Sequence, residues 1–195
     1  MFQVRNVVKP VILVLGLATL AERTTEASDG LTLLLEPAGA SRLFNAGDKV
    51  MVRVTLLNPA AGQSWVIVPR LVLGSGGVWP EPELRFRVWD AQGKEIPVPP
   101  PFSIDKRALP SLCAFTDMQL GTYFGRNVQL AEKPFGPLFP EPGHFRVRAV
   151  VEIKARQWLE RAIEKGYVSS KDVHFPIDRV ADTVLESQDL EIEVR

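Results

Sequence analysis

Residues 49–59, KVMVRVTLLNP, alternate between the two faces of an extended chain. Every second residue from Val50 to Leu56 is aliphatic, and alternation with this period predicts a strand with one face in a core. Asn58-Pro59 ends the strand, because proline has no N–H for the ladder and keeps the residue before it out of helical space. We therefore expect a central strand of an all-β sandwich here.

A second segment, residues 144–153, has the same alternation. We expect it to be the other central strand, with its apolar face meeting that of residues 49–57 in one core. The apolar positions of this strand are Phe145, Val147, Ala149 and Val151. The remaining strand candidates are residues 31–36, 64–73 (interrupted by Pro69), 83–89, 95–98, 127–130 and 190–194.

Residues 83–89 and 95–98 are predicted to form a β-hairpin. The link between them, DAQGK, begins with Asp90, which favours the start of a type I turn, and has Gly93 at a position suited to left-handed backbone.

One helix is expected among the strands, over residues 155–165, ARQWLERAIEK. Its apolar residues recur at helical spacing, and Gly166 is a suitable stop. These apolar residues are Trp158, Leu159, Ala162 and Ile163. The helix belongs to an insertion that we expect to cover residues 154–183.

The N-terminal residues 1–21 are typical of a secretory signal peptide. Arg5 and Lys9 precede the apolar run VILVLGLATL, and small residues allow cleavage after Ala21 or as late as Ala27. A membrane anchor is the alternative, but the apolar run is shorter than the roughly 20 residues needed to span a bilayer. We expect a secreted or periplasmic protein, free of the membrane after cleavage, with one folded domain over residues 28–195.

The overall composition excludes some function classes. Lys and Arg total 23 and Asp and Glu total 23, so the basic excess of a nucleic-acid binder is absent. Cys113 is the only cysteine, which excludes a disulfide within the chain. We expect its side chain to be a small buried apolar group.

Several segments together resemble bacterial immunoglobulin-like or fibronectin-III-like extracellular modules. They are residues 52–59, residues 84–94 with VWDAQGK, Gly121, residues 128–130 and residues 142–149, PGHFRVRA. The order of these segments is also similar to that of bacterial proteinase inhibitors with an immunoglobulin-like fold. The resemblance implies an antiparallel immunoglobulin-like β-sandwich of seven to eight strands, here with one inserted amphipathic helix.

No residue pattern indicates catalysis or a resident metal or cofactor. A nucleophile pair of Cys113 with His144 or His174 would need closeness that the sequence does not indicate. Only these three residues could supply nitrogen or sulfur to zinc, and they lack ligand spacing. We expect no catalytic residue, no metal ligand and no cofactor.

Four aromatic residues in proline-rich loops are the candidates for partner binding: Trp79, Phe102, Phe135 and Phe139. Exposed loop aromatics can anchor a partner, whereas the alternative is that they fold back to cap the sandwich or to pack against the helix.

The expected function is a non-enzymatic exported interaction module that recognises a protein or a cell-envelope component. One alternative is a proteinase inhibitor that presents the proline-rich loop 97–110 or 131–142. A further alternative is an enzyme that uses Cys113.

Overall fold

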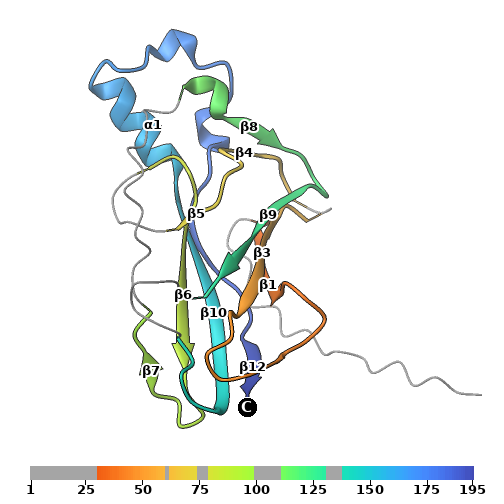
Figure 1. The fold of residues 1–195 in the computed structure, drawn as a ribbon. Coiled ribbons are helices and arrows are strands. Elements are labelled where there is room, and N and C mark those ends of the chain that lie inside the picture. Colours follow the sequence, from red (N-terminus) through yellow and green to blue (C-terminus); the bar gives the residue numbers. More distant parts are fainter. Residues whose placement is uncertain (1–29, 60–61, 74–78, 99–110, 131–137) are drawn as a thin grey trace, which may run out of the picture.

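The computed structural model describes residues 30–59, 62–73, 79–98, 111–130 and 138–195. The signal-peptide prediction and most of both proline-rich loops lie outside these residues. The described chain is mainly β, with a single α-helix, α1 (Ala155–Glu164) (Figure 1). None of its helices is long and apolar enough to cross a membrane.

The strands form a three-stranded sheet in the order β1-β3-β9, a seven-stranded sheet built on β2-β12-β10-β6-β5, and the pair β4-β8. In the seven-stranded sheet, β11 also pairs with β10, and β7 with β6. The strands are β1 (Thr32–Pro37), β2 (Leu43–Phe44), β3 (Met51–Leu57), β4 (Trp65–Ile67), β5 (Val72–Leu73), β6 (Glu83–Trp89), β7 (Glu95–Ile96), β8 (Thr116–Met118), β9 (Tyr123–Gln129), β10 (Gly143–Lys154), β11 (Asp182–Glu186) and β12 (Leu190–Val194).

The strand expected at residues 49–57 is β3, and it is central in its sheet as predicted. β1 pairs with one side of it and β9 with the other, both antiparallel. Its alternating aliphatic residues, from Val50 to Leu56, are all buried. The alternation therefore reports a strand whose even-numbered side chains face the core.

β10 is the central strand of the larger sheet. β6 runs along one side of it, while β12 and then β11 share the other side. Val147, Ala149 and Val151 are buried and Phe145 is half-buried, as the alternation predicted.

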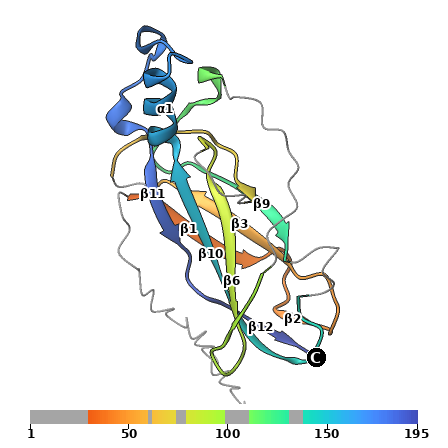
Figure 2. The same cartoon turned by 90° about the vertical axis from the view of Figure 1, so that its left-hand side faces the viewer.

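The two larger sheets face each other across a shared core. β1 contacts β10, β11 and β12, and Figure 2 shows β1 and β3 passing obliquely behind β10 and β6. The buried residues of β3 and β10 belong to one hydrophobic cluster. The prediction that these two faces share a core is confirmed.

The predicted hairpin is present between β6 and β7. The Gly93 amide donates to the Asp90 carbonyl, and the Asp90 Oδ1 accepts from the amides of Gln92 and Lys94. Gly93 has a φ of 79°, the left-handed conformation that the turn requires.

The predicted helix is also confirmed, and α1 covers one end of the fold (Figure 1). It continues directly from β10 and buries Trp158, Leu159 and Ala162. The Trp158 ring packs at 5.9 Å from the ring of Phe115, which stacks in turn on Phe175 at 5.3 Å. Two 3-10 turns, η3 (Ser170–Asp172) and η4 (Ile177–Arg179), lead back to β11.

Three features differ from the expectations. Twelve strands occur in the described residues instead of seven or eight, because β2, β8 and β11 were not anticipated and residues 64–73 form two strands around Pro69. The sheets are not wholly antiparallel, since β2 pairs parallel to β12 and β5 parallel to β6. The segment expected as insertion ends inside β11, which begins at Asp182. These short strands have too few residues to show a period.

Candidate functional site

The outer face of the seven-stranded sheet carries a set of charged side chains around one tryptophan. Alternate residues of β6 point to this face, and the register places Trp89 opposite Arg146 and Arg87 opposite Arg148. We call Trp89, Arg87, Arg146, Arg148 and their acidic partners, Glu95, Glu186 and Asp189, the Trp89 cluster.

Three guanidinium groups surround the half-buried Trp89 ring. The distances from Cζ to the ring centroid are 4.9 Å for Arg87, 5.5 Å for Arg148 and 5.6 Å for Arg146. All three are within the range of a cation–π interaction, worth about 0.5–1 kcal/mol at an exposed site. Because the three cations repel one another, this arrangement needs nearby carboxylates.

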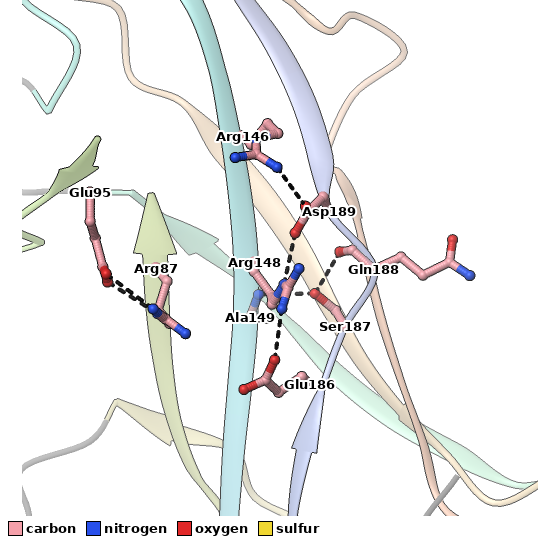
Figure 3. Close-up of polar contacts among 9 residues, drawn as sticks. All are labelled: Arg87, Glu95, Arg146, Arg148, Ala149, Glu186, Ser187, Gln188 and Asp189. Carbon is pink, nitrogen blue, oxygen red and sulfur yellow. Dashed lines mark hydrogen bonds and ion pairs between the residues drawn. The ribbon is translucent and has the colours of Figure 1, made fainter. Parts of the chain in front are cut away.

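Those carboxylates come from the neighbouring strands (Figure 3). Glu95 on β7 receives two hydrogen bonds from Arg87, at 3.1 and 3.0 Å. Arg148 donates to Asp189 at 2.7 Å and to Glu186 at 2.9 Å. Arg146 is held more loosely, with 3.5 Å between its Nη1 and Asp189.

A bulge between β11 and β12 places Asp189 beside the arginines. Ser187 is buried there, its amide donates to the Ala149 carbonyl, and its hydroxyl accepts from the Ala149 amide (Figure 3). The hydroxyl donates in turn to the Gln188 carbonyl. The chain thus leaves the ladder for a few residues between the two strands that pair with β10.

The ion pairs shift the pKa values of their members. The hydrogen bonds between Arg87 and Glu95 lower the pKa of the Glu95 carboxyl and raise that of the guanidinium. The bond from Arg148 to Asp189 is the main reason that the Arg148 pKa is raised. These shifts favour the ionised forms of Glu95, Arg87 and Arg148 at neutral pH.

An open groove of about 640 Å³ adjoins the cluster at the end of the sheet. Arg146 belongs to both, and the other charged or titratable lining residues are Arg42, Asp90, His144, Glu191 and Glu193. We call it the end groove. Its lining is completed by the apolar residues Leu43, Ala91, Phe145 and Ile192.

Two charged side chains of the end groove have no ion pair or side-chain hydrogen bond within the described residues, namely those of Arg42 and Glu191. By contrast, Glu193 is bound by Arg195 at 2.8 Å, which lowers the Glu193 pKa. Asp90 is occupied by the amides of its own turn. Among the described residues, the groove thus has one cation, Arg42, and one anion, Glu191, that are not paired.

The cluster and the groove together present guanidinium groups, carboxylates and one imidazole, that of His144. In the described part of the chain, no three His, Cys, Asp or Glu residues gather closely enough to hold a metal ion. The arginines are permanent cations and cannot act as general acids or bases near neutral pH.

The structure describes two of the four aromatic residues predicted to bind a partner, Trp79 and Phe139. Phe139 is only 2% exposed and packs on Phe145 at 4.8 Å, so for this residue the alternative applies, in which the ring caps the sandwich instead of facing a partner. It folds back onto the sandwich because aromatic burial is worth more than exposure. Trp79 is half-buried, whereas Phe102 and Phe135 lie outside the described residues.

Cys113 is exposed, which contradicts the prediction that it is buried. It lies in the short helix η2 (Leu112–Ala114), where the Ser111 hydroxyl accepts a hydrogen bond from the Cys113 amide. The buried side chain of this segment is that of Phe115. The Cys113 thiol has no partner within the described residues.

The histidines lie at opposite ends of β10. His144 lies near the N-terminal end of β10, in the end groove. The segment with Cys113 packs against α1, which follows the C-terminal end of β10 (Figure 1). A Cys113–His144 pair is therefore excluded. Phe115 stacks on Phe175, so His174 lies at the same end as Cys113, but its exposed imidazole makes no hydrogen bond within the described chain.

No family model and no curated protein matches this chain.

Sequence analysis missed the residues of the Trp89 cluster. The only signal was that Trp89, Arg87, Arg146 and Arg148 all fall on the polar faces of two alternating strands. That these two polar faces lie side by side depends on the pairing of β6 with β10.

Proposed function

We propose that this protein is an exported, non-enzymatic interaction module that binds a protein or cell-envelope component through the Trp89 cluster and the end groove. The observation that carries the proposal is the Trp89 ring, which lies half-exposed among three guanidiniums on a sheet face that the described helix does not cover. Tryptophan and arginine are the side chains most enriched at binding hot spots.

The fold that we propose is an immunoglobulin-like sandwich. In support, β1, β3 and β9 pair in the order of strands A, B and E, while β6, β10 and β12 pair in the order of C, F and G. The helical insertion then lies between the positions of strands F and G. Modules of this architecture present binding surfaces on a rigid scaffold.

The cluster suits binding because its side chains are already held in place. Arg87 and Arg148 are each fixed by two hydrogen bonds to carboxylates. Less side-chain freedom is lost on association when the groups are preorganised in this way. Arg146 is the most loosely held of the three and lines the groove, so we assign it the first contact with a ligand.

The unpaired charges of the end groove favour a partner that carries both an anionic and a cationic or hydrogen-bonding group. Arg42 would receive the anionic group, and Glu191 would receive the donor. The half-exposed apolar lining at Leu43 and Phe145 would contact apolar parts of the same partner.

The test compares variants for retention of components from the native envelope extract on the purified, naturally processed protein. We expect Trp89→Ala and Arg146→Ala each to weaken retention of the partner by about thirtyfold, the size of a hot-spot loss. Arg53→Ala is the matched control, because Arg53 is also an exposed strand arginine with one hydrogen bond, to Asn127 at 3.2 Å. Equal retention by all four proteins would refute the site.

Export is tested separately by fractionating the native cells and sequencing the N-terminus of the recovered protein. We expect the processed chain to begin after residue 21, or as late as after residue 27, and to be recovered outside the cytoplasm. Recovery of an unprocessed chain in the cytoplasm would refute export but would leave the binding surface untouched.

A further inference from the structure

β9 lies at the edge of the three-stranded sheet, and no described strand pairs with its outer side along residues 123–127. It has seven residues and pairs only with β3 among the described strands. An unpaired edge presents a row of N–H and C=O groups that another strand can bind.

Two backbone hydrogen bonds fix which groups of β9 face outward. The Asn58 amide donates to the Thr122 carbonyl, and the Leu130 amide donates to the Val50 carbonyl, both at 2.9 Å. Because bonding groups alternate along an antiparallel strand, the even-numbered residues of β9 bond to β3. The amides and carbonyls of Tyr123, Gly125 and Asn127 therefore point away from the sheet.

This edge lacks the usual protection against pairing. β9 contains no proline and no lysine, and Tyr123 is 72% exposed. The one charged side chain, Arg126, donates to the Leu71 carbonyl at 2.9 Å. By comparison, the opposite edge strand, β1, ends in Pro37, and the amide and carbonyl of Leu43 on β2 are both bound by the Ser41 hydroxyl.

We propose that β9 pairs antiparallel with β9 of a second copy of this chain, about a two-fold axis at Gly125. Gly125 then lies opposite Gly125 of the other copy, and Tyr123 lies opposite Asn127. Tyr123, Gly125 and Asn127 of each copy then exchange two hydrogen bonds at each of the three pairs, which joins the two three-stranded sheets into one.

Charge and shape favour a second copy in this register. Arg126 lies opposite Phe124 of the other copy, so like charges do not face each other. An axis at Arg126 would instead set two arginines together. Gly125 has no side chain, since a Cβ there would collide with the Val54 carbonyl oxygen. The Tyr123 ring can therefore lie diagonally over the glycine of the other copy, as aromatic residues do over edge glycines.

The test is sedimentation velocity on the native protein between micromolar and millimolar concentration, with hydrogen exchange measured at both ends of the range. We expect a concentration-dependent dimer. The amides of Tyr123, Gly125 and Asn127 should be unprotected in the dilute protein and protected in the concentrated protein, while those of Phe124 and Arg126 should be protected throughout.

Two variants at Tyr123 distinguish the contribution of its backbone N–H to dimerisation from that of its side chain. Tyr123→Pro removes an outward N–H without removing a bond to β3, because proline is tolerated at the start of an edge strand. We expect it to weaken dimerisation at least tenfold with an unchanged melting temperature of the monomer. Tyr123→Ala keeps the N–H, and we expect it to weaken dimerisation by no more than about threefold.

Three results would overturn the inference. The first is a monomer at every concentration. The second is a dimer in which the three odd-numbered amides gain no protection, which would place the contact elsewhere. The third is protection of these amides in the dilute monomer, which would show that another part of the same chain already covers the edge.

Discussion

At the scale of single residues, neighbouring positions of β3 have opposite tolerance to charge. Val54 is fully buried, whereas the next residue toward the N-terminus, Arg53, points to solvent and donates to Asn127. We expect Val54→Arg to abolish folding, because a buried charge without a partner costs more than the usual stability of a domain can absorb. Arg53→Lys should change the free energy of unfolding by less than about 0.5 kcal/mol. Urea unfolding followed by circular dichroism measures both.

The ion pair of Glu95 with Arg87 predicts a pH dependence. The folded pKa of Glu95 lies below its ordinary value of 4.5, so its contribution to stability is present above that value and is lost as the pH falls through the folded pKa. Glu95→Gln should therefore melt below the wild type at pH about 7 and level with it once the pH has fallen through the folded pKa. Melting curves across this range test it, and a difference that grows toward acid would contradict the assignment.

At the scale of elements, a buried asparagine connects the strand pair β3-β9 with the strand pair β4-β8. Asn58 ends β3, is fully buried, and its Nδ2 donates to the carbonyls of Gln63 and Met118. These bonds hold Gln63, near the start of β4, and Met118, the last residue of β8, against the end of β3. Asn58, which the sequence places at the end of the β3 strand, thus also connects this strand with β4 and β8.

Asn58→Ala should therefore lower the free energy of unfolding by about 1–3 kcal/mol, because it leaves the buried Met118 carbonyl without a donor. Asn127→Ala is the matched control, since that amide is exposed and among the described residues bonds only to Arg53, and it should cost less than about 0.5 kcal/mol. Chemical denaturation measures the loss of unfolding free energy in the two variants. Equal losses would show that Asn58 only ends the strand and does not stabilise the connection between the two strand pairs.

At the scale of the whole molecule, the two proposed surfaces belong to different sheets. The Trp89 cluster lies on the outer face of the seven-stranded sheet, and the open edge belongs to the three-stranded sheet on the other side of the core. Pairing through β9 would leave the cluster accessible in both copies.

The two surfaces should then respond independently to substitution. We expect Trp89→Ala to leave the dimer dissociation constant unchanged, and Tyr123→Pro to leave partner retention unchanged when it is corrected for avidity. Sedimentation and retention measurements on both variants test this. Loss of both properties in either variant would show that the surfaces are coupled or that the variant is misfolded.

The sequence by itself determined the elements that are long enough to show a hydrophobic period. The alternation in residues 49–57, 83–89 and 144–153 and the helical spacing in residues 155–165 each gave the correct element and the correct buried face. The turn at Asp90 and Gly93 was also predictable from the sequence, because the hydrogen bonds of the aspartate and the backbone conformation of the glycine lie within the turn itself.

Only the tertiary structure decided what contacts are made between distant parts of the chain. Cys113 is exposed and Phe139 is buried because neighbouring aromatic rings compete for the core, and no local pattern records that competition. The short strands β2 and β11 form along the edges of longer strands, β12 and β10, and β8 forms by pairing with β4, a strand of equal length. The Trp89 cluster exists because β6 and β10, far apart in sequence, are hydrogen-bonded in a register that brings their polar faces together. Periodicity fixes which side of a strand is polar, but only strand pairing fixes which polar sides meet.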